Sequence, residues 1–312
     1  MSCPLREIVA AQGFVVLDGG LATTLETMGA VLDDPLWSAR LLVDSPELVR
    51  RAHEAFLDAG ADCVATATYQ ATHQGFRRRG LSDAQGTASM QLATTLACEA
   101  RDAFLERLPA DRPAPLVAAS LGPYGAFLAD GGEYRGDYGL DEDALYAFHR
   151  PRWQVLASGP ADLLACETIP SLPETLALLR LLDETPGTQA WISFSCRDAE
   201  TLWDGGALAE AVRACDERPN VAAVGVNCTA PSRIAALIRV LRENTDKPVL
   251  VYPNAGEAWD PTRKVWLGQS VSGDWVEAAA EWLRLGAVGV GGCCRTGPAE
   301  IRRLRRILDS SR

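Results

Sequence analysis

The stretch Ala287-Val288-Gly289-Val290-Gly291-Gly292-Cys293-Cys294-Arg295-Thr296 combines a strand signal with a chemical one. Its first four residues are apolar, which predicts a short buried strand. Two adjacent cysteines follow beside glycines, at the point where that strand ends. Such a pair indicates either a site for a soft metal ion or two small side chains in the core. The rest of the chain has to decide between these interpretations.

This strand is the last of eight short apolar runs that alternate with helical patterns along the 312 residues. The other seven runs cover residues 14–17, 62–68, 115–121, 162–166, 189–195, 221–226 and 248–252. Near-continuous apolar runs are typical of parallel strands that helices cover on the outside. Eight such units predict one (β/α)8 TIM barrel domain over residues 1–312, with its active site at the C-terminal ends of the strands. A doubly wound open sheet is the alternative, and the lack of Gly-x-Gly-x-x-Gly after the first strand disfavours its dinucleotide-binding form.

Helices are expected between the strands. The clearest begins at Ser45, as N-cap, with Pro46 in its first turn, and ends at Gly60. The others are expected at about 82–108, 141–158, 173–183, 206–216, 231–243, 275–285 and 298–308. The loop 129–139 is rich in Gly, Asp and Tyr, and it is long enough to cover a site at the barrel rim.

The composition indicates a soluble globular protein, with 47% hydrophobic and 23% charged residues. No apolar run approaches the length of about 18 residues that spans a membrane. Residues 1–10 lack the apolar core of a secretion signal. The formal net charge of −11 opposes non-specific binding to nucleic acid. We therefore expect a cytoplasmic protein whose partners are small molecules, and the sequence leaves the oligomeric state open.

Three of the nine cysteines fall at corresponding places in this barrel. Cys228 follows the sixth strand, as the Cys293-Cys294 pair follows the eighth, and those two strands flank the seventh. An odd number of cysteines without a secretion signal argues against a disulfide framework. Three converging thiolates favour Zn²⁺ and leave its fourth tetrahedral position open, as in a catalytic site. Cys196, at the end of the fifth strand, is the alternative ligand.

Zinc bound by three thiolates is a poor activator of water, but it can hold a fourth thiolate that stays nucleophilic. The chemistry that this indicates is alkyl transfer to sulfur. An amino-acid thiol also needs its ammonium group held, and Asp18 and Glu167 are carboxylates at the ends of the first and fourth strands. The alternatives are a turn residue for Asp18 and a charge at a helix start for Glu167. Tyr69 ends the second strand, and Asn254 follows the seventh.

The chain resembles the homocysteine S-methyltransferase family over almost its whole length. The segments that carry the resemblance are Leu17-Asp18-Gly19-Gly20-Leu21-Ala22-Thr23, Asp34-Pro35-Leu36-Trp37-Ser38, Ala65-Thr66-Ala67-Thr68-Tyr69-Gln70-Ala71-Thr72, Gly122-Pro123-Tyr124-Gly125-Ala126, Glu133-Tyr134-Arg135-Gly136, Cys166-Glu167-Thr168-Ile169-Pro170, Gly225-Val226-Asn227-Cys228, Tyr252-Pro253-Asn254 and Gly291-Gly292-Cys293-Cys294-Arg295-Thr296. The resemblance implies a zinc-dependent transfer of a methyl group to L-homocysteine, which forms methionine.

Carried over to this chain, the resemblance implies Cys228, Cys293 and Cys294 as the zinc ligands and catalytic residues. It implies that Asp18 and Glu167 hold the amino group of homocysteine. Tyr69 lies in a segment near the methyl donor, and Asn254 is expected as a further substrate-binding residue.

Branches of the family use S-methylmethionine, S-adenosylmethionine, betaine or a methylated corrinoid as donor. The short chain argues against the corrinoid branch. Segments 34–38, 133–136 and 167–170 look more like the S-methylmethionine branch than the betaine branch. S-adenosylmethionine as donor and selenocysteine as acceptor stay open.

Two other functions compete with this one. A non-catalytic barrel that binds zinc or thiols would have the same cysteines. A lyase or aldolase would need a Schiff-base lysine, and the chain has only Lys247 and Lys264, neither of them at a strand end.

Overall fold

A computed structural model describes residues 3–32, 34, 36–110, 112–260, 265–267 and 275–310. Lys264, and Pro35 of the 34–38 segment, lie outside the described residues. Eight parallel strands form one sheet in the order β1-β10-β7-β6-β5-β4-β3-β2. Their bounds are β1 Val15–Val16, β2 Cys63–Ala65, β3 Leu116–Leu121, β4 Leu163–Ile169, β5 Ala190–Phe194, β6 Val221–Asn227, β7 Val249–Tyr252 and β10 Gly289–Val290.

Backbone contacts between the first two strands close this sheet into a barrel. Leu17 forms a parallel bridge with Cys63. The N–H of Asp18 donates to the carbonyl of Cys63 at 3.1 Å, and the N–H of Asp62 donates to the carbonyl of Val16 at 2.6 Å. The predicted (β/α)8 TIM barrel is therefore confirmed, and the open doubly wound sheet is excluded.

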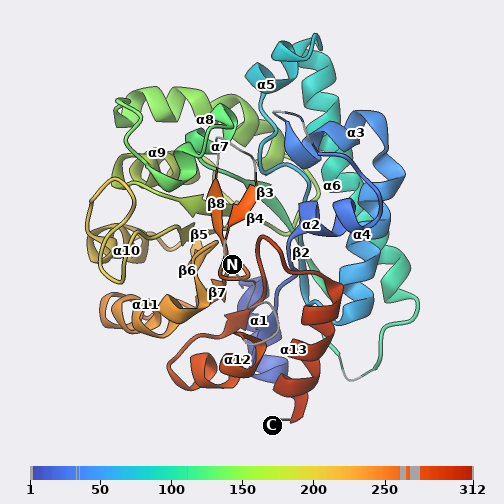
Figure 1. Ribbon diagram of the computed structural model, residues 1–312, viewed down its shortest axis with the longest axis vertical. Helices are drawn as coiled ribbons and strands as arrows, with labels where there is room; N and C mark the ends of the chain where they lie inside the picture. The colour runs from blue at the N-terminus through green and yellow to red at the C-terminus, as the bar shows by residue number, and fades with distance from the viewer. Residues whose placement is uncertain are drawn as a thin grey trace.

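Helices surround the strands (Figure 1). Those expected from the sequence are α4 Pro46–Ala59, α6 Asp83–Leu105, α8 Glu142–Ala157, α9 Leu172–Asp183, α10 Leu208–Asp216, α11 Pro231–Asn244, α12 Trp275–Arg284 and α13 Pro298–Ser310. The sequence did not predict the shorter elements. These are α1 Pro4–Gln12, α2 Leu21–Thr27, η1 Trp37–Arg40, α3 Leu41–Asp44, α5 His73–Arg78, α7 Tyr124–Leu128, η2 Gly132–Tyr134 and the hairpin of β8 Ala258–Asp260 with β9 Val265–Leu267.

The start of α4 differs in one detail from the expectation. Pro46 occupies the first turn and Gly60 ends the helix in a left-handed conformation with φ 106°, as predicted. The side chain of Ser45 makes no capping bond to the helix. Its hydroxyl donates instead to the carbonyl of Asp44 at 2.7 Å. Proline lacks the N–H of the first helical position, so one of the four donors that a helix start leaves unpaired is already absent.

The core has two layers, because successive side chains of a strand point to opposite faces. Inside the barrel, Val15, Trp191 and Leu250 belong to one cluster that Leu5 and Ile8 of α1 complete. Outside, alternate residues of the same strands pack against the surrounding helices. The apolar interior and α1 fill the end of the barrel where the strands begin, which leaves the opposite rim for a cavity.

Among the described residues, no helix combines the length and the apolar character needed to cross a membrane.

Candidate active site

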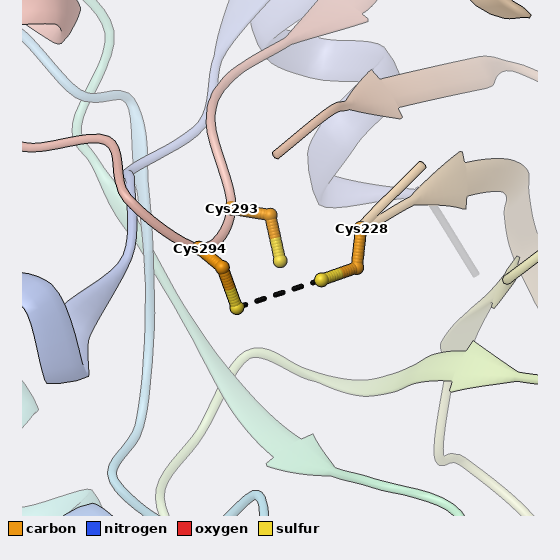
Figure 2. Close-up of side chains that lie close together, drawn as sticks. All are labelled: Cys228, Cys293 and Cys294. Atoms are coloured by element: carbon orange, nitrogen blue, oxygen red, sulfur yellow. Dashed lines mark hydrogen bonds between the residues drawn. The ribbon is translucent and has the colours of Figure 1, made fainter. Parts of the chain in front are cut away.

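Three cysteine thiols meet at the C-terminal rim of the barrel (Figure 2). Cys228 directly follows β6, and Cys293 and Cys294 follow β10, so the two strands that flank β7 supply all three. The three Sγ atoms all lie within 4.8 Å of one another, and those of Cys228 and Cys294 are 3.5 Å apart. Metal–sulfur bonds of about 2.3 Å in tetrahedral geometry place sulfur atoms roughly 3.8 Å apart. The cluster therefore fits one soft ion with only small adjustments.

The glycines beside the cysteine pair have a packing role. In the structure β10 ends at Val290, so the strand alternation no longer governs Cys293 and Cys294. A Cβ on Gly291 would lie 2.5 Å from the Cβ of Leu17, and one on Gly292 would lie 2.1 Å from the hydroxyl of Thr296. The glycines let the loop pack closely against its neighbours.

The three thiols differ in acidity because they hydrogen-bond to one another. Hydrogen bonds with Cys293 and Cys294 hold the pKa of Cys228 well below its ordinary value. Burial opposes this effect, and a bond with Tyr134 adds to it. The same bonds with Cys228 raise the pKa values of Cys293 and Cys294. Metal ligands must be deprotonated. A cluster in which one thiolate is already favoured is suited to exchanging its protons for a cation.

Tyr134 is a site residue that the sequence reasoning missed. Its hydroxyl lies 3.0 Å from the Sγ of Cys228, although 94 positions separate the two residues. Tyr134 belongs to η2, inside the 129–139 loop that was expected to cover a site. The neighbouring Glu133 also lines the cavity, and burial raises its pKa to about 7. The only sign of Tyr134 in the sequence was that residues 133–136 resemble a segment of the family.

The buried carboxylate of Asp18 and the half-buried carboxylate of Glu167 share the cavity with the thiols. Asp18 accepts the N–H of Ala65 at 2.8 Å, and Glu167 accepts a hydrogen bond from the hydroxyl of Ser120. Burial raises the pKa of Asp18 well above its ordinary value, and the nearby charge of Glu167 adds to this effect. Burial likewise raises the pKa of Glu167 to about 7. Two carboxylates that are costly to ionise together form a site where a bound cation is favourable.

Glu167 reaches the cavity because β4 is longer than the sequence indicated. The expected strand ended at Cys166, whereas β4 runs to Ile169. Ala165 belongs to the interior cluster, so Glu167, two positions later, also points into the barrel. The charge is therefore inside a strand and not at a helix start.

The other predicted residues divide between the cavity and its surroundings. Tyr69 lines the cavity, but Asn254 is absent from its lining. The side-chain amide of Asn254 donates to the carbonyl of Cys228 at 3.4 Å, and its oxygen accepts the N–H of Gly256 at 2.9 Å. Asn254 thus contacts the backbone of a thiol-bearing residue. Cys196 is fully buried and lies outside the thiol cluster.

A side-chain amide joins the two halves of the site. Asn227 accepts the N–H of Thr168 at 2.8 Å and donates to the Thr168 hydroxyl at 2.8 Å. Its NH₂ group also lies 3.8 Å from the Sγ of Cys293. Thr168 has a left-handed backbone with φ 63°, which is unfavourable for a β-branched residue. The contacts of Asn227 hold this conformation next to Glu167.

We expect Asn227→Ala to lower the free energy of unfolding by about 1–3 kcal/mol, because it leaves the buried N–H of Thr168 without an acceptor. Thermal and urea unfolding measure the change. Asn244→Ala is a matched control, since that half-buried amide bonds Arg213 at the surface and its loss should cost less than about 0.5 kcal/mol. Equal losses in the two variants would contradict the assigned role of Asn227.

The cavity that contains these groups has a volume of about 380 Å³, within the range of small-molecule sites. A family model described as homocysteine S-methyltransferase matches residues 15–308, almost the entire barrel. The chain belongs to the homocysteine S-methyltransferase family. As a member of this family it is a methyltransferase.

Named members of this family align with nearly the whole chain. The homocysteine S-methyltransferase YbgG of Bacillus subtilis is 48% identical over 96% of each chain. A selenocysteine Se-methyltransferase of Brassica oleracea is 43% identical over 96% of this chain and 90% of its own. The metallated form of the homocysteine methyltransferase MmuM from Escherichia coli superposes with a TM-score of 0.88 at 44% identity, covering 97% of this chain and 99% of that one.

Proposed function

We propose that this protein transfers a methyl group from a sulfonium donor to the thiolate of L-homocysteine held on Zn²⁺, forming methionine. The donor is S-methylmethionine or S-adenosylmethionine. The observation that carries the proposal is the convergence of three thiols with the carboxylates of Asp18 and Glu167 in one cavity. We take residues 1–312 as one catalytic domain and place it in the cytoplasm, where its nine free thiols would stay reduced.

The donor set supports zinc. Cys228, Cys293 and Cys294 would hold the ion, and three thiolates leave one tetrahedral position for substrate sulfur. When bound, the ion keeps an incoming thiol as a thiolate at neutral pH. A metallated form of the Escherichia coli relative supports a role for a metal in this chain.

Asp18 and Glu167 would bind the ammonium group of homocysteine and so orient its sulfur toward the thiol cluster. Ammonium binding lowers the pKa of each carboxylate, which offsets the cost of ionising both in a buried place. Tyr69 is proposed to line the donor side of the cavity. We propose that Asn254 acts on the substrates through the backbone of Cys228 that it holds.

Methyl transfer from a sulfonium ion needs no acid. A lone pair of the acceptor sulfur forms the new S–CH₃ bond, and the electron pair of the broken C–S⁺ bond leaves with a neutral thioether. The protein has to align three atoms in a line and to exclude water, which is mainly a positioning task. The alternatives differ in substrate or in the chemistry itself: a betaine donor, a selenocysteine acceptor, or a barrel that only binds zinc and thiols. The name of the Brassica relative keeps selenocysteine among the acceptors to be tested.

The Schiff-base alternative has no support among the described residues. The Nζ atom of Lys247 donates to the carbonyl of Arg218 at 2.8 Å, and Lys247 lies just before β7, at the barrel end opposite the thiols.

An assay of zinc-loaded protein with homocysteine and each donor in turn tests the proposal. We expect methionine from S-methylmethionine or S-adenosylmethionine, and at most a trace from betaine, because betaine carries no sulfonium leaving group. Protein treated with a chelator should be inactive and should recover when zinc is returned. Binding of zinc and homocysteine without methionine from any donor would favour the non-catalytic barrel. Equal rates with betaine would overturn the choice of branch.

A further inference from the structure

The charges that line the cavity are unequal. Among the described residues, five carboxylates line it together with the thiol cluster, and one cationic side chain, Arg78, does so. The carboxylates are those of Asp18, Glu26, Asp34, Glu133 and Glu167. Such a cavity attracts a sulfonium ion, but it repels the carboxylate of any amino acid that enters it.

Arg78 differs from both of its neighbours in the chain. Arg77 pairs with Asp83 at 3.3 Å, and Arg79 pairs with Asp34 and Asp44 at 3.3 Å each. In the described part of the chain, no carboxylate pairs with Arg78. Its guanidinium lies over the ring of Phe127, 4.1 Å from the centroid. The ring contact holds this charge at the edge of the cavity.

The position of Arg78 suits contact with the methyl donor and not with the acceptor amino acid. Arg78 is exposed at the end of α5, whereas Asp18 and Cys228 are buried and Glu167, Cys293 and Cys294 are half-buried, which places this group deeper in the cavity. An acceptor amino acid with its ammonium on the inner carboxylates occupies the inner end. A donor must then bind between the acceptor and the mouth, where Arg78 lies.

We propose that Arg78 binds the α-carboxylate of an amino-acid sulfonium donor at the mouth of the cavity. This inference rests on the proposed function, and it deepens it by naming how the donor is recognised. A guanidinium binds a carboxylate through two parallel hydrogen bonds, which fixes direction as well as position. With its carboxylate fixed at the mouth, the donor points its sulfonium inward, past the carboxylates that line the cavity and toward the acceptor sulfur.

The test compares Arg78→Gln with the wild type in steady-state kinetics of the zinc-loaded protein. The KM for S-methylmethionine should rise about 10- to 100-fold, as expected for the loss of a charged hydrogen-bonded pair. The KM for homocysteine should change less than about twofold, since the inner carboxylates are intact. Arg78→Lys should recover part of the loss because it keeps the charge. Arg77→Gln is the matched control, because Arg77 pairs with Asp83 and does not line the cavity.

A second donor identifies the group that Arg78 recognises. (3-Aminopropyl)dimethylsulfonium is S-methylmethionine without its carboxylate, so wild type and Arg78→Gln should use it with the same KM. A rise in KM for both donors alike, or for homocysteine instead, would overturn the proposal. If the wild type is active and Arg78→Gln has the same KM for S-methylmethionine, the role of Arg78 is refuted and the proposed function stands. A wild type that forms no methionine from either sulfonium would instead refute the proposed function itself.

Discussion

Cys228→Ala should release the metal ion and abolish methyl transfer. Loss of a residue that merely supports a ligand costs about 10- to 100-fold in metal affinity, so loss of a ligand should cost more than about 100-fold. Cys228 also has the thiol with the lowered pKa, which makes it the first of the three to offer a thiolate. Metal content after dialysis, measured per chain, and methionine formation should fall together.

Cys196→Ala is the matched control for this experiment. It removes a fully buried thiol at the end of a neighbouring strand, outside the cluster. We expect about one metal ion per chain and nearly full activity in that variant. Wild-type metal content and activity in Cys228→Ala would show that the thiol cluster is not the catalytic metal site.

The second large effect is expected at Glu167. Glu167→Gln keeps the size of the side chain but removes the charge that faces the ammonium of homocysteine. Breaking one side of a buried charge pair costs about 2–5 kcal/mol, which corresponds to a rise in KM of about 30-fold or more. The acceptor 4-mercaptobutanoate lacks the amino group, so its KM should not change in the variant. An unchanged KM for homocysteine would contradict the proposed role of Glu167.

The pH dependence gives a second measure of the same residue. Burial raises the pKa of Glu167 from 4.5 to about 7, so below that pH the side chain is neutral and attracts ammonium weakly. In the wild type, kcat/KM for homocysteine should therefore fall as the pH drops below about 7. The decrease should be smaller in Glu167→Gln, where only Asp18, whose pKa burial also raises, still faces the ammonium group. The folded chain also binds this proton more tightly than the unfolded chain, so ionisation lowers stability as the pH rises from 4.5 to about 7. The glutamine variant avoids that loss.

The barrel was predictable because its strands are buried on both faces. Such strands appear as apolar runs, and all eight runs in the sequence became strands of one sheet. Their ends then placed Cys228 near Cys293 and Cys294 without any knowledge of distances. The hairpin of β8 and β9 was missed because its strands of three residues lie outside the longer apolar runs that marked the barrel strands.

Contacts that depend on the path of a loop could not be predicted. Nothing local in the sequence shows that Tyr134 reaches Cys228, because the path of the 129–139 loop depends on packing with distant residues. The inward direction of Glu167 depended on where β4 ends, and strand ends are the least certain part of a pattern. Asn254 follows a strand, but the sequence did not show that its amide contacts the backbone of Cys228.

Because the thiols are far apart along the chain, a bound metal ion would also stabilise the fold. Cys228 and Cys294 are 66 positions apart, and α11, β7, the β8–β9 hairpin, α12 and β10 lie between them. An ion that joins them closes this part of the chain into a loop, as a removable cross-link would. Its binding free energy then adds to the stability of the fold, by about 2.7 kcal/mol when the free metal is at 100 times its dissociation constant. Metal supply would therefore set how tightly the last quarter of the barrel is held, as well as whether the enzyme turns over.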